Sequence, residues 1–263
     1  MQQVRDFLAE SEALAEVLAP LTAAEWEQAT QFKGWTVNDV IVHLHFWNRA
    51  ADLSLVDPDG FTALMGEVFP KMMQQGMRAV ENAEISARGP ALFSLWRDQF
   101  RDMAARWAEV DPKRRLKWAG PEMSARSSIT ARQMETWAHG QEIFDLLGVE
   151  RADADRIANI VVLGVNTFGW SHKVQGLEVP EMVPRLRLTA PSGAIWEYGD
   201  PGSADLIEGP AVDFARVVTQ TRNIADTALR VSGPVATQWM ATAQCFAGGK
   251  EAPPDPGTRF TQG

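Results

Sequence analysis

The sequence predicts a mainly α protein, α+β overall, in which an antiparallel four-helix bundle precedes a smaller α/β domain. Three observations lead to this fold class. Long stretches of the first half carry apolar residues at helical spacing and are joined by short to moderate connections, as in a bundle. The stretch at residues 129–147 is apolar on nearly every side, which is typical of an interior helix. After Gly148 the pattern changes to short alternating runs that indicate strands.

Start and stop signals bound the helices of the expected bundle. A first amphipathic helix covers residues 2–19, and Pro20 ends it. Thr22 and Glu25 have the capping-box spacing for a short helix. Thr36 caps the next helix, which runs to about residue 55, and Asp39 lies near the positive end of its dipole. Further helices are expected at residues 61–80, 91–110 and 129–147, so that the bundle occupies residues 1–150.

The smaller domain is expected at residues 151–249. A bridging helix at residues 153–175 is followed by two alternating runs, 185–189 and 194–198, around a Pro-Ser-Gly turn, which predict a β-hairpin. A further short run follows at 205–208, and the pairs Gly209-Pro210 and Gly233-Pro234 each open a helix. Residues 250–263 have the composition of a disordered tail.

Composition excludes several classes of partner. The net charge of −9 leaves no basic surplus to neutralise phosphates, so no nucleic-acid partner is expected. No segment approaches a membrane span, and the acidic N-terminal segment does not resemble a signal peptide, so we expect a cytoplasmic protein that does not bind membranes. The single cysteine, Cys245, excludes internal disulfides and multi-cysteine metal sites and is expected to be a buried, inert thiol.

Glu135 and His139 are the first candidates for chemistry. Residues four apart share one face of a helix, so the carboxylate and the imidazole lie one turn apart on the interior helix. Two donors at this spacing can hold one divalent cation. A second interpretation is an ordinary Glu–His pair in which Arg132 neutralises Glu135. A metal site needs a third ligand.

The histidines differ in the helix face that they occupy. On a helical wheel His43 lies among apolar residues on the core-facing side, whereas His45 falls on the opposite, polar side and is expected at the surface. A lone core histidine is usually a hydrogen-bonded packing residue, but His43 faces a helix that directs Glu135 and His139 inward, which favours a ligand. His172, near the end of the bridging helix, is expected to cap carbonyls or to pack.

Two segments resemble a known family. GWTVNDVIVHL at residues 34–44, followed about ninety residues later by RQMETWAH at 132–139, resembles the mycothiol-dependent maleylpyruvate isomerase family, within the DinB/YfiT-like superfamily of metal-binding four-helix bundles. The resemblance implies that His43, Glu135 and His139 bind a divalent metal, typically zinc. Segments 207–213, 219–222 and 243–248 look like a branch often described only as metal-binding proteins. Where this sequence has Glu142 the family pattern leads us to expect aspartate, so Glu142 is interpreted as a residue that contacts a metal ligand or lies at the surface.

The resemblance implies an isomerase or S-transferase that uses mycothiol or another small thiol and acts on a small acidic or electrophilic substrate. Arg222 is the candidate catalytic residue, because an acidic substrate needs a cation; its alternative is a surface residue paired with Asp226. Trp35, Trp47 and Trp137 either line the cavity or pack in the core. The alternative function is a non-catalytic metal-binding sensor or interaction module. A homodimer is left open.

Overall fold

The computed structural model describes residues 1–263, which divide into two compact units, Met1–Ile143 and Phe144–Gly263. The protein is mainly α, with a smaller α/β part, which confirms the predicted fold class. None of its helices combines the length and the apolar character that a membrane crossing requires. The elements of the first unit are α1 (Gln2–Leu18), α2 (Ala23–Trp26), α3 (Val37–Val56), α4 (Pro58–Gln75), α5 (Met77–Glu84), α6 (Gly89–Trp107), the strands β1 (Arg115–Leu116) and β2 (Met123–Ser124), and α7 (Ala125–Leu146), whose last turn belongs to the second unit.

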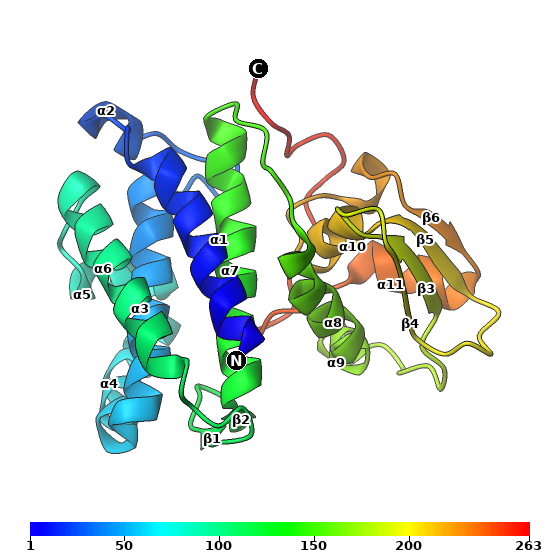
Figure 1. The fold of residues 1–263 in the computed structure, drawn as a ribbon, viewed down its shortest axis with the longest axis horizontal. Helices are drawn as coiled ribbons and strands as arrows, with labels where there is room; N and C mark the ends of the chain where they lie inside the picture. Colours follow the sequence, from blue (N-terminus) through cyan, green and yellow to red (C-terminus); the bar gives the residue numbers. More distant parts are fainter. The chain divides into compact units, whose positions relative to one another are not determined.

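Helix α3 is the centre of the first unit. It packs against α4, α5 and α6, and α1 packs on α6 (Figure 1). Trp96, Phe100 and Trp107 of α6 and Trp137 of α7 are fully buried and fill the space between the helices. Because α3 has neighbours on several sides, most of its residues are buried and little of its length meets solvent.

The expected helix starts are present. The side chains of Thr22 and Thr36 accept hydrogen bonds from the backbone N–H groups of Glu25 and Asp39. The carboxylates of Glu25 and Asp39 in turn accept hydrogen bonds from the backbone N–H groups of Thr22 and Thr36, which completes two capping boxes. The single helix expected at residues 61–80 is wrong, because Gly76 adopts a φ of +85° and divides the segment into α4 and α5.

The second unit combines short helices with a four-stranded sheet. Its strand order is β4-β3-β5-β6; β3 and β4 form the predicted antiparallel hairpin, and β3 pairs with β5 in parallel. The expected bridging helix is divided near Thr167, and α10 packs against the sheet. Its elements are η1 (Asp155–Ile157), α8 (Ala158–Asn166), α9 (Phe168–Val174), β3 (Arg185–Thr189), β4 (Ile195–Tyr198), β5 (Leu206–Pro210), α10 (Ala211–Val218), η2 (Ile224–Asp226), β6 (Arg230–Ser232) and α11 (Pro234–Thr242).

Residues 250–263, where the composition predicts a disordered tail, contain no helix or strand. They nevertheless make specific contacts within the second unit. The backbone N–H of Gln262 and the hydroxyl of Thr261 donate to Asp145, and Arg259 donates to the carbonyl of Gln220.

Candidate metal centre

His43 projects from the middle of α3 toward α7. Its ring is buried, with 6% of the residue exposed, and its Nε2 atom faces Glu135. The helix begins at the Thr36 cap, so His43 lies two turns into a rigid element whose apolar neighbours fix its direction. The helical-wheel assignment of His43 to the core-facing side is confirmed.

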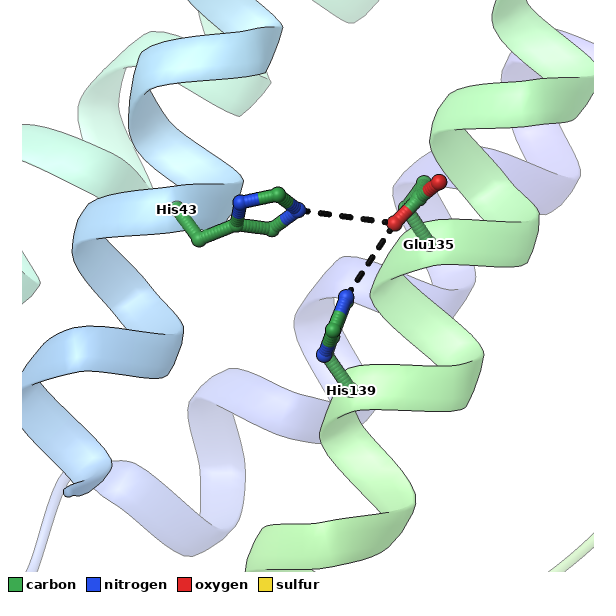
Figure 2. Close-up of side chains that lie close together, drawn as sticks. All are labelled: His43, Glu135 and His139. Carbon is green, nitrogen blue, oxygen red and sulfur yellow. Dashed lines mark ion pairs between the residues drawn. The ribbon is translucent and has the colours of Figure 1, made fainter. Parts of the chain in front are cut away.

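Glu135 and His139 lie one turn apart on α7 and face His43 (Figure 2). The Oε2 atom of Glu135 is 3.5 Å from Nε2 of His43 and 3.2 Å from Nε2 of His139. One ligand atom from each of the three residues lies within 4.8 Å of the others. In a tetrahedral zinc site with ligand distances near 2.1 Å, ligand atoms are about 3.4 Å apart, and the two separations measured from Glu135 are close to this value.

The charges in this cluster shift the pKa values of its members. Burial alone lowers the pKa of His43, but the carboxylates of Glu81 and Glu135 outweigh burial and raise it to about 9. Burial works against ionisation of Glu135 too, yet hydrogen bonds with His139 and His43 and the charge of Arg132 hold its pKa well below 4.5. His139 has a lowered pKa, chiefly because it is buried. The metal-free cluster thus pairs an imidazolium at residue 43 with two carboxylates.

Glu81, on α5, is part of the site although the sequence analysis did not select it. The residue is only 1% exposed, and its Oε1 atom lies 2.9 Å from Nδ1 of His43 and accepts a hydrogen bond of 2.7 Å from Nε1 of Trp47. No local pattern in the sequence selects Glu81, because its partners His43 and Trp47 lie 38 and 34 residues away in the chain.

Two aromatic residues of the loop before α3 cover the imidazoles. The indole of Trp35 is parallel to the His139 ring, with centroids 5.8 Å apart, and meets the His43 ring at 5.4 Å with a steep angle. Phe32 contacts the His139 ring edge to face at 5.1 Å. The loop can place both rings because Lys33 and Gly34 adopt left-handed φ values of 51° and 66°.

The other two tryptophans considered in the sequence analysis have different positions. Trp137 is fully buried among the packing residues of the helical unit. Trp47 is 7% exposed and contacts both the His43 ring and Glu81. Trp47 therefore belongs to the surroundings of the candidate site through its indole N–H.

Arg132 supplies a cation beside the cluster. Its Nη2 atom is 3.9 Å from Oε1 of Glu135, and its guanidinium lies over the Trp118 ring at 5.7 Å from the centroid. The side chain is almost fully buried, which lowers its pKa. The interpretation from the sequence in which Arg132 neutralises Glu135 is consistent with this contact.

The expectation for His45 was wrong, because the residue is buried, with only 7% exposed. The polar face of α3 that carries His45 packs against α6. With the Gln99 side-chain amide oriented to satisfy its hydrogen bonds, its nitrogen donates to Nδ1 of His45. Burial, together with the charge of Arg49, lowers the pKa of His45 to about 4. His172 packs on Phe168, and its Nδ1 lies 2.9 Å from that residue's carbonyl oxygen, as expected for a packing residue.

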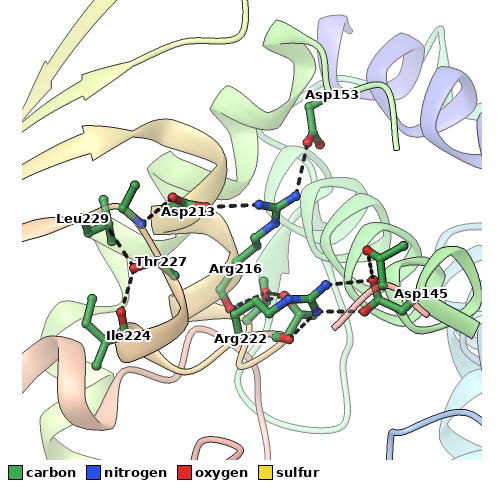
Figure 3. Close-up of polar contacts among 12 residues, drawn as sticks. Asp145, Asp153, Asp213, Arg216, Arg222, Ile224, Thr227 and Leu229 are labelled. Atoms are coloured by element: carbon green, nitrogen blue, oxygen red, sulfur yellow. Dashed lines mark hydrogen bonds and ion pairs between the residues drawn. The ribbon is translucent and has the colours of Figure 1, made fainter. Parts of the chain in front are cut away.

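Arg222 lies in a buried ion-pair network of the second unit (Figure 3). Its guanidinium donates two hydrogen bonds to the carboxylate of Asp145, at 2.7 and 2.8 Å, and a third to the carbonyl of Thr221. The alternative of an exposed pair with Asp226 was wrong, since the partner is Asp145. A role for Arg222 toward substrate stays a prediction.

Comparison with known proteins agrees with this fold. Residues 7–144 match the sequence model of the mycothiol maleylpyruvate isomerase N-terminal domain. Uncharacterized proteins from the CDC 1551 and H37Rv strains of Mycobacterium tuberculosis are 36% identical over 246 residues, which cover 93% of this chain and 95% of each relative.

Two solved structures share the fold. A crystal structure of the mycothiol-dependent maleylpyruvate isomerase superposes with a TM-score of 0.58 at 15% identity, covering 89% of this chain and 95% of that chain. A histidine-to-alanine mutant of the mycothiol-dependent maleylpyruvate isomerase gives a TM-score of 0.55 at 19% identity, covering 82% of this chain and 87% of that chain. The suspected resemblance is confirmed at the level of the family, and the chain belongs to the family defined by the mycothiol maleylpyruvate isomerase N-terminal domain.

Proposed function

We propose that His43, Glu135 and His139 bind one zinc ion, and that the protein uses this ion to activate a small thiol, such as mycothiol, for isomerisation or S-transfer on a small acidic or electrophilic substrate. One observation carries the proposal: the three ligand atoms come from two helices and converge within 4.8 Å. Two imidazoles and one carboxylate are the ligand set of many catalytic zinc sites, which keep a fourth position open.

The balance of buried charge favours an anionic fourth ligand. Around the site lie the carboxylates of Glu81 and Glu135 and the guanidinium of Arg132. A divalent ion bound by two neutral imidazoles would leave this cluster with one net positive charge. A thiolate in the fourth position makes the cluster neutral, and buried clusters are most stable when their charges are paired.

The chemistry then follows from the activation of a thiol. Zinc lowers the pKa of a thiol bound to it and so supplies a thiolate near neutral pH. For an isomerase, the sulfur adds to an activated carbon–carbon double bond, the resulting single bond rotates, and elimination of the same sulfur restores the double bond in the other geometry. The S-transferase reaction retains the new carbon–sulfur bond: after an addition the resulting carbanion takes up a proton, and in a substitution the leaving group departs with the electron pair of the broken bond.

The residues of this chain would orient the reactants and limit access of water. Trp35 and Phe32 cover the imidazoles, whereas the Glu135 side chain is 20% exposed, so the cluster is open to solvent at the carboxylate. We keep Arg222 as the proposed cation for an acidic substrate group. The Arg222 guanidinium donates hydrogen bonds to Asp145, so the acidic group of a substrate would have to share this guanidinium with Asp145. We place the protein in the cytoplasm, where small thiols are kept reduced.

Metal analysis of the purified chain tests the site directly. Wild-type protein prepared without chelators is expected to contain one zinc per chain, and His43→Ala to lose it. His45→Ala is the matched control, because it removes a buried histidine from the same helix outside the cluster and should retain the metal. Full zinc retention by His43→Ala would end the three-ligand proposal.

A second experiment separates an enzyme from a metal-binding sensor or interaction module. Zinc-loaded protein is incubated with mycothiol or glutathione and a panel of electrophiles that includes cis-configured α,β-unsaturated acids. We expect zinc-dependent thiol consumption or cis–trans conversion that His43→Ala lacks. Tight zinc binding without turnover across the panel would instead favour the non-catalytic alternative.

A further inference from the structure

The contact between Glu81 and His43 determines which nitrogen of the imidazole is available. Oε1 of Glu81 lies 2.9 Å from Nδ1 of His43, while Nε2 of the same ring points to Glu135. A carboxylate accepts hydrogen bonds, so the proton of a neutral His43 belongs on Nδ1. The lone pair is then on Nε2, directed at the candidate metal position.

We infer that Glu81 is the positioning residue of the metal centre: it holds the His43 ring in the Nδ1–H tautomer and in the orientation that presents Nε2 to the ion. This inference rests on the proposed zinc site and adds a residue from a third helix, α5, to the two helices that carry the ligands. Such carboxylate–histidine–metal arrangements orient ligands and raise their basicity.

The surroundings of Glu81 hold its carboxylate in place. Trp47 donates a hydrogen bond to the same Oε1 atom of Glu81. Glu81 is only 1% exposed, so solvent does not compete for this oxygen. The next residue, Asn82, donates to Asp39 at the start of α3 and accepts a hydrogen bond from Arg88. These contacts attach α5 to the helix that carries His43, so the donor and the acceptor keep their mutual geometry.

Zinc affinity in three variants separates a positioning role from a packing role. Glu81→Leu removes the acceptor and keeps an apolar side chain, so we expect the zinc dissociation constant to rise about 10- to 100-fold. Glu81→Gln keeps an oxygen that can accept from Nδ1, and should restore most of the affinity. Trp47→Phe removes the other donor to Oε1, which helps to hold the carboxylate, and is expected to weaken zinc binding less than Glu81→Leu does.

Two matched measurements control for folding. Glu84→Gln changes an exposed carboxylate on the same helix and should behave as wild type in both affinity and thermal stability. Cobalt(II) replaces zinc in all variants and reports ligand geometry through its visible absorption. We expect an altered cobalt spectrum in Glu81→Leu and an unaltered one in Glu84→Gln.

A tautomer measurement on the unmodified protein needs no variant. In zinc-loaded wild-type protein labelled with nitrogen-15, long-range proton–nitrogen correlation spectra should assign the proton of His43 to Nδ1 and the metal to Nε2. Zinc on Nδ1, or a Glu81→Leu variant that binds zinc as tightly as wild type, would overturn the inference. Failure of the proposed site is distinguishable, because wild type itself would then bind no zinc.

Discussion

The pKa of His43 predicts opposite effects of pH on the metal-free protein and on zinc binding. In the folded, metal-free chain this pKa is raised from 6.5 to about 9 by Glu81 and Glu135, which outweigh the effect of burial. A raised histidine pKa stabilises the fold below the unfolded value of 6.5, and that contribution disappears as the pH passes through about 9. The difference between the two values corresponds to roughly 3 kcal/mol.

The stability change is measured by urea unfolding of chelator-treated protein between pH 6.5 and 9.5. We expect the free energy of unfolding to fall across this range, by an amount of the order of 3 kcal/mol. His43→Gln is the control and should show a much flatter profile. His45 and His139 have lowered pKa values, so both stay neutral across this range. A metal-free wild type whose stability is constant or rises across the window would refute the reasoning.

Zinc binding should depend on pH in the reverse sense, because the ion must displace the proton of His43. Below pH 9 we expect the zinc affinity to rise by about tenfold per pH unit, with close to one proton released per ion. Calorimetric titration of zinc into the protein, in two buffers of different ionisation enthalpy, gives the number of protons released per ion. Where a competing chelator is needed to measure the affinity, its own proton release is subtracted. Absence of proton release at pH 7.5 would show that His43 is already neutral in the metal-free protein.

Three further substitutions test the fold, each by urea unfolding of the full chain. Thr36→Ala removes the side-chain cap of α3 and should cost about 1 kcal/mol, whereas a cost near zero would show that the capping box is unimportant. Arg222→Met leaves the buried Asp145 without its ion-pair partner and should lower the free energy of unfolding by about 3–5 kcal/mol. The double variant Arg222→Met/Asp145→Leu should recover most of this loss, and an equal loss in both variants would contradict the ion-pair argument. Gly199→Ala places a methyl group against the carbonyl of Pro184 at a left-handed φ of +78°, and should cost more than about 1 kcal/mol, so a neutral effect would contradict the close approach.

The inward direction of the three candidate ligands was predictable from the sequence because it depends on local geometry. Spacing of four on α7 puts Glu135 and His139 on one face, and the apolar neighbours of His43 put it on the core side of α3. Helix starts were predictable for the same reason, since the capping boxes at Thr22 and Thr36 involve residues only three apart.

The features that sequence analysis missed depend on tertiary packing. A helical wheel assumes one buried side, but α3 is covered by several helices, so the polar face that carries His45 is buried as well. Glu81 was missed because one continuous helix was expected to end at residue 80, whereas Gly76 breaks the chain and redirects α5 toward His43. The partner of Arg222 could not be found locally, because Asp145 is 77 residues away in the chain.

The convergence of α3 and α7 on one position has a consequence for the stability of the folded chain. His43 and Glu135 are separated by about ninety residues, so an ion shared between them would act as a removable cross-link across more than a third of the sequence. An ion that binds only the folded state stabilises that state by RT ln(1 + c/Kd), where c is the free concentration of the ion, so the stabilisation grows with that concentration. A shortage of the metal would then lower the fraction of the chain that is folded.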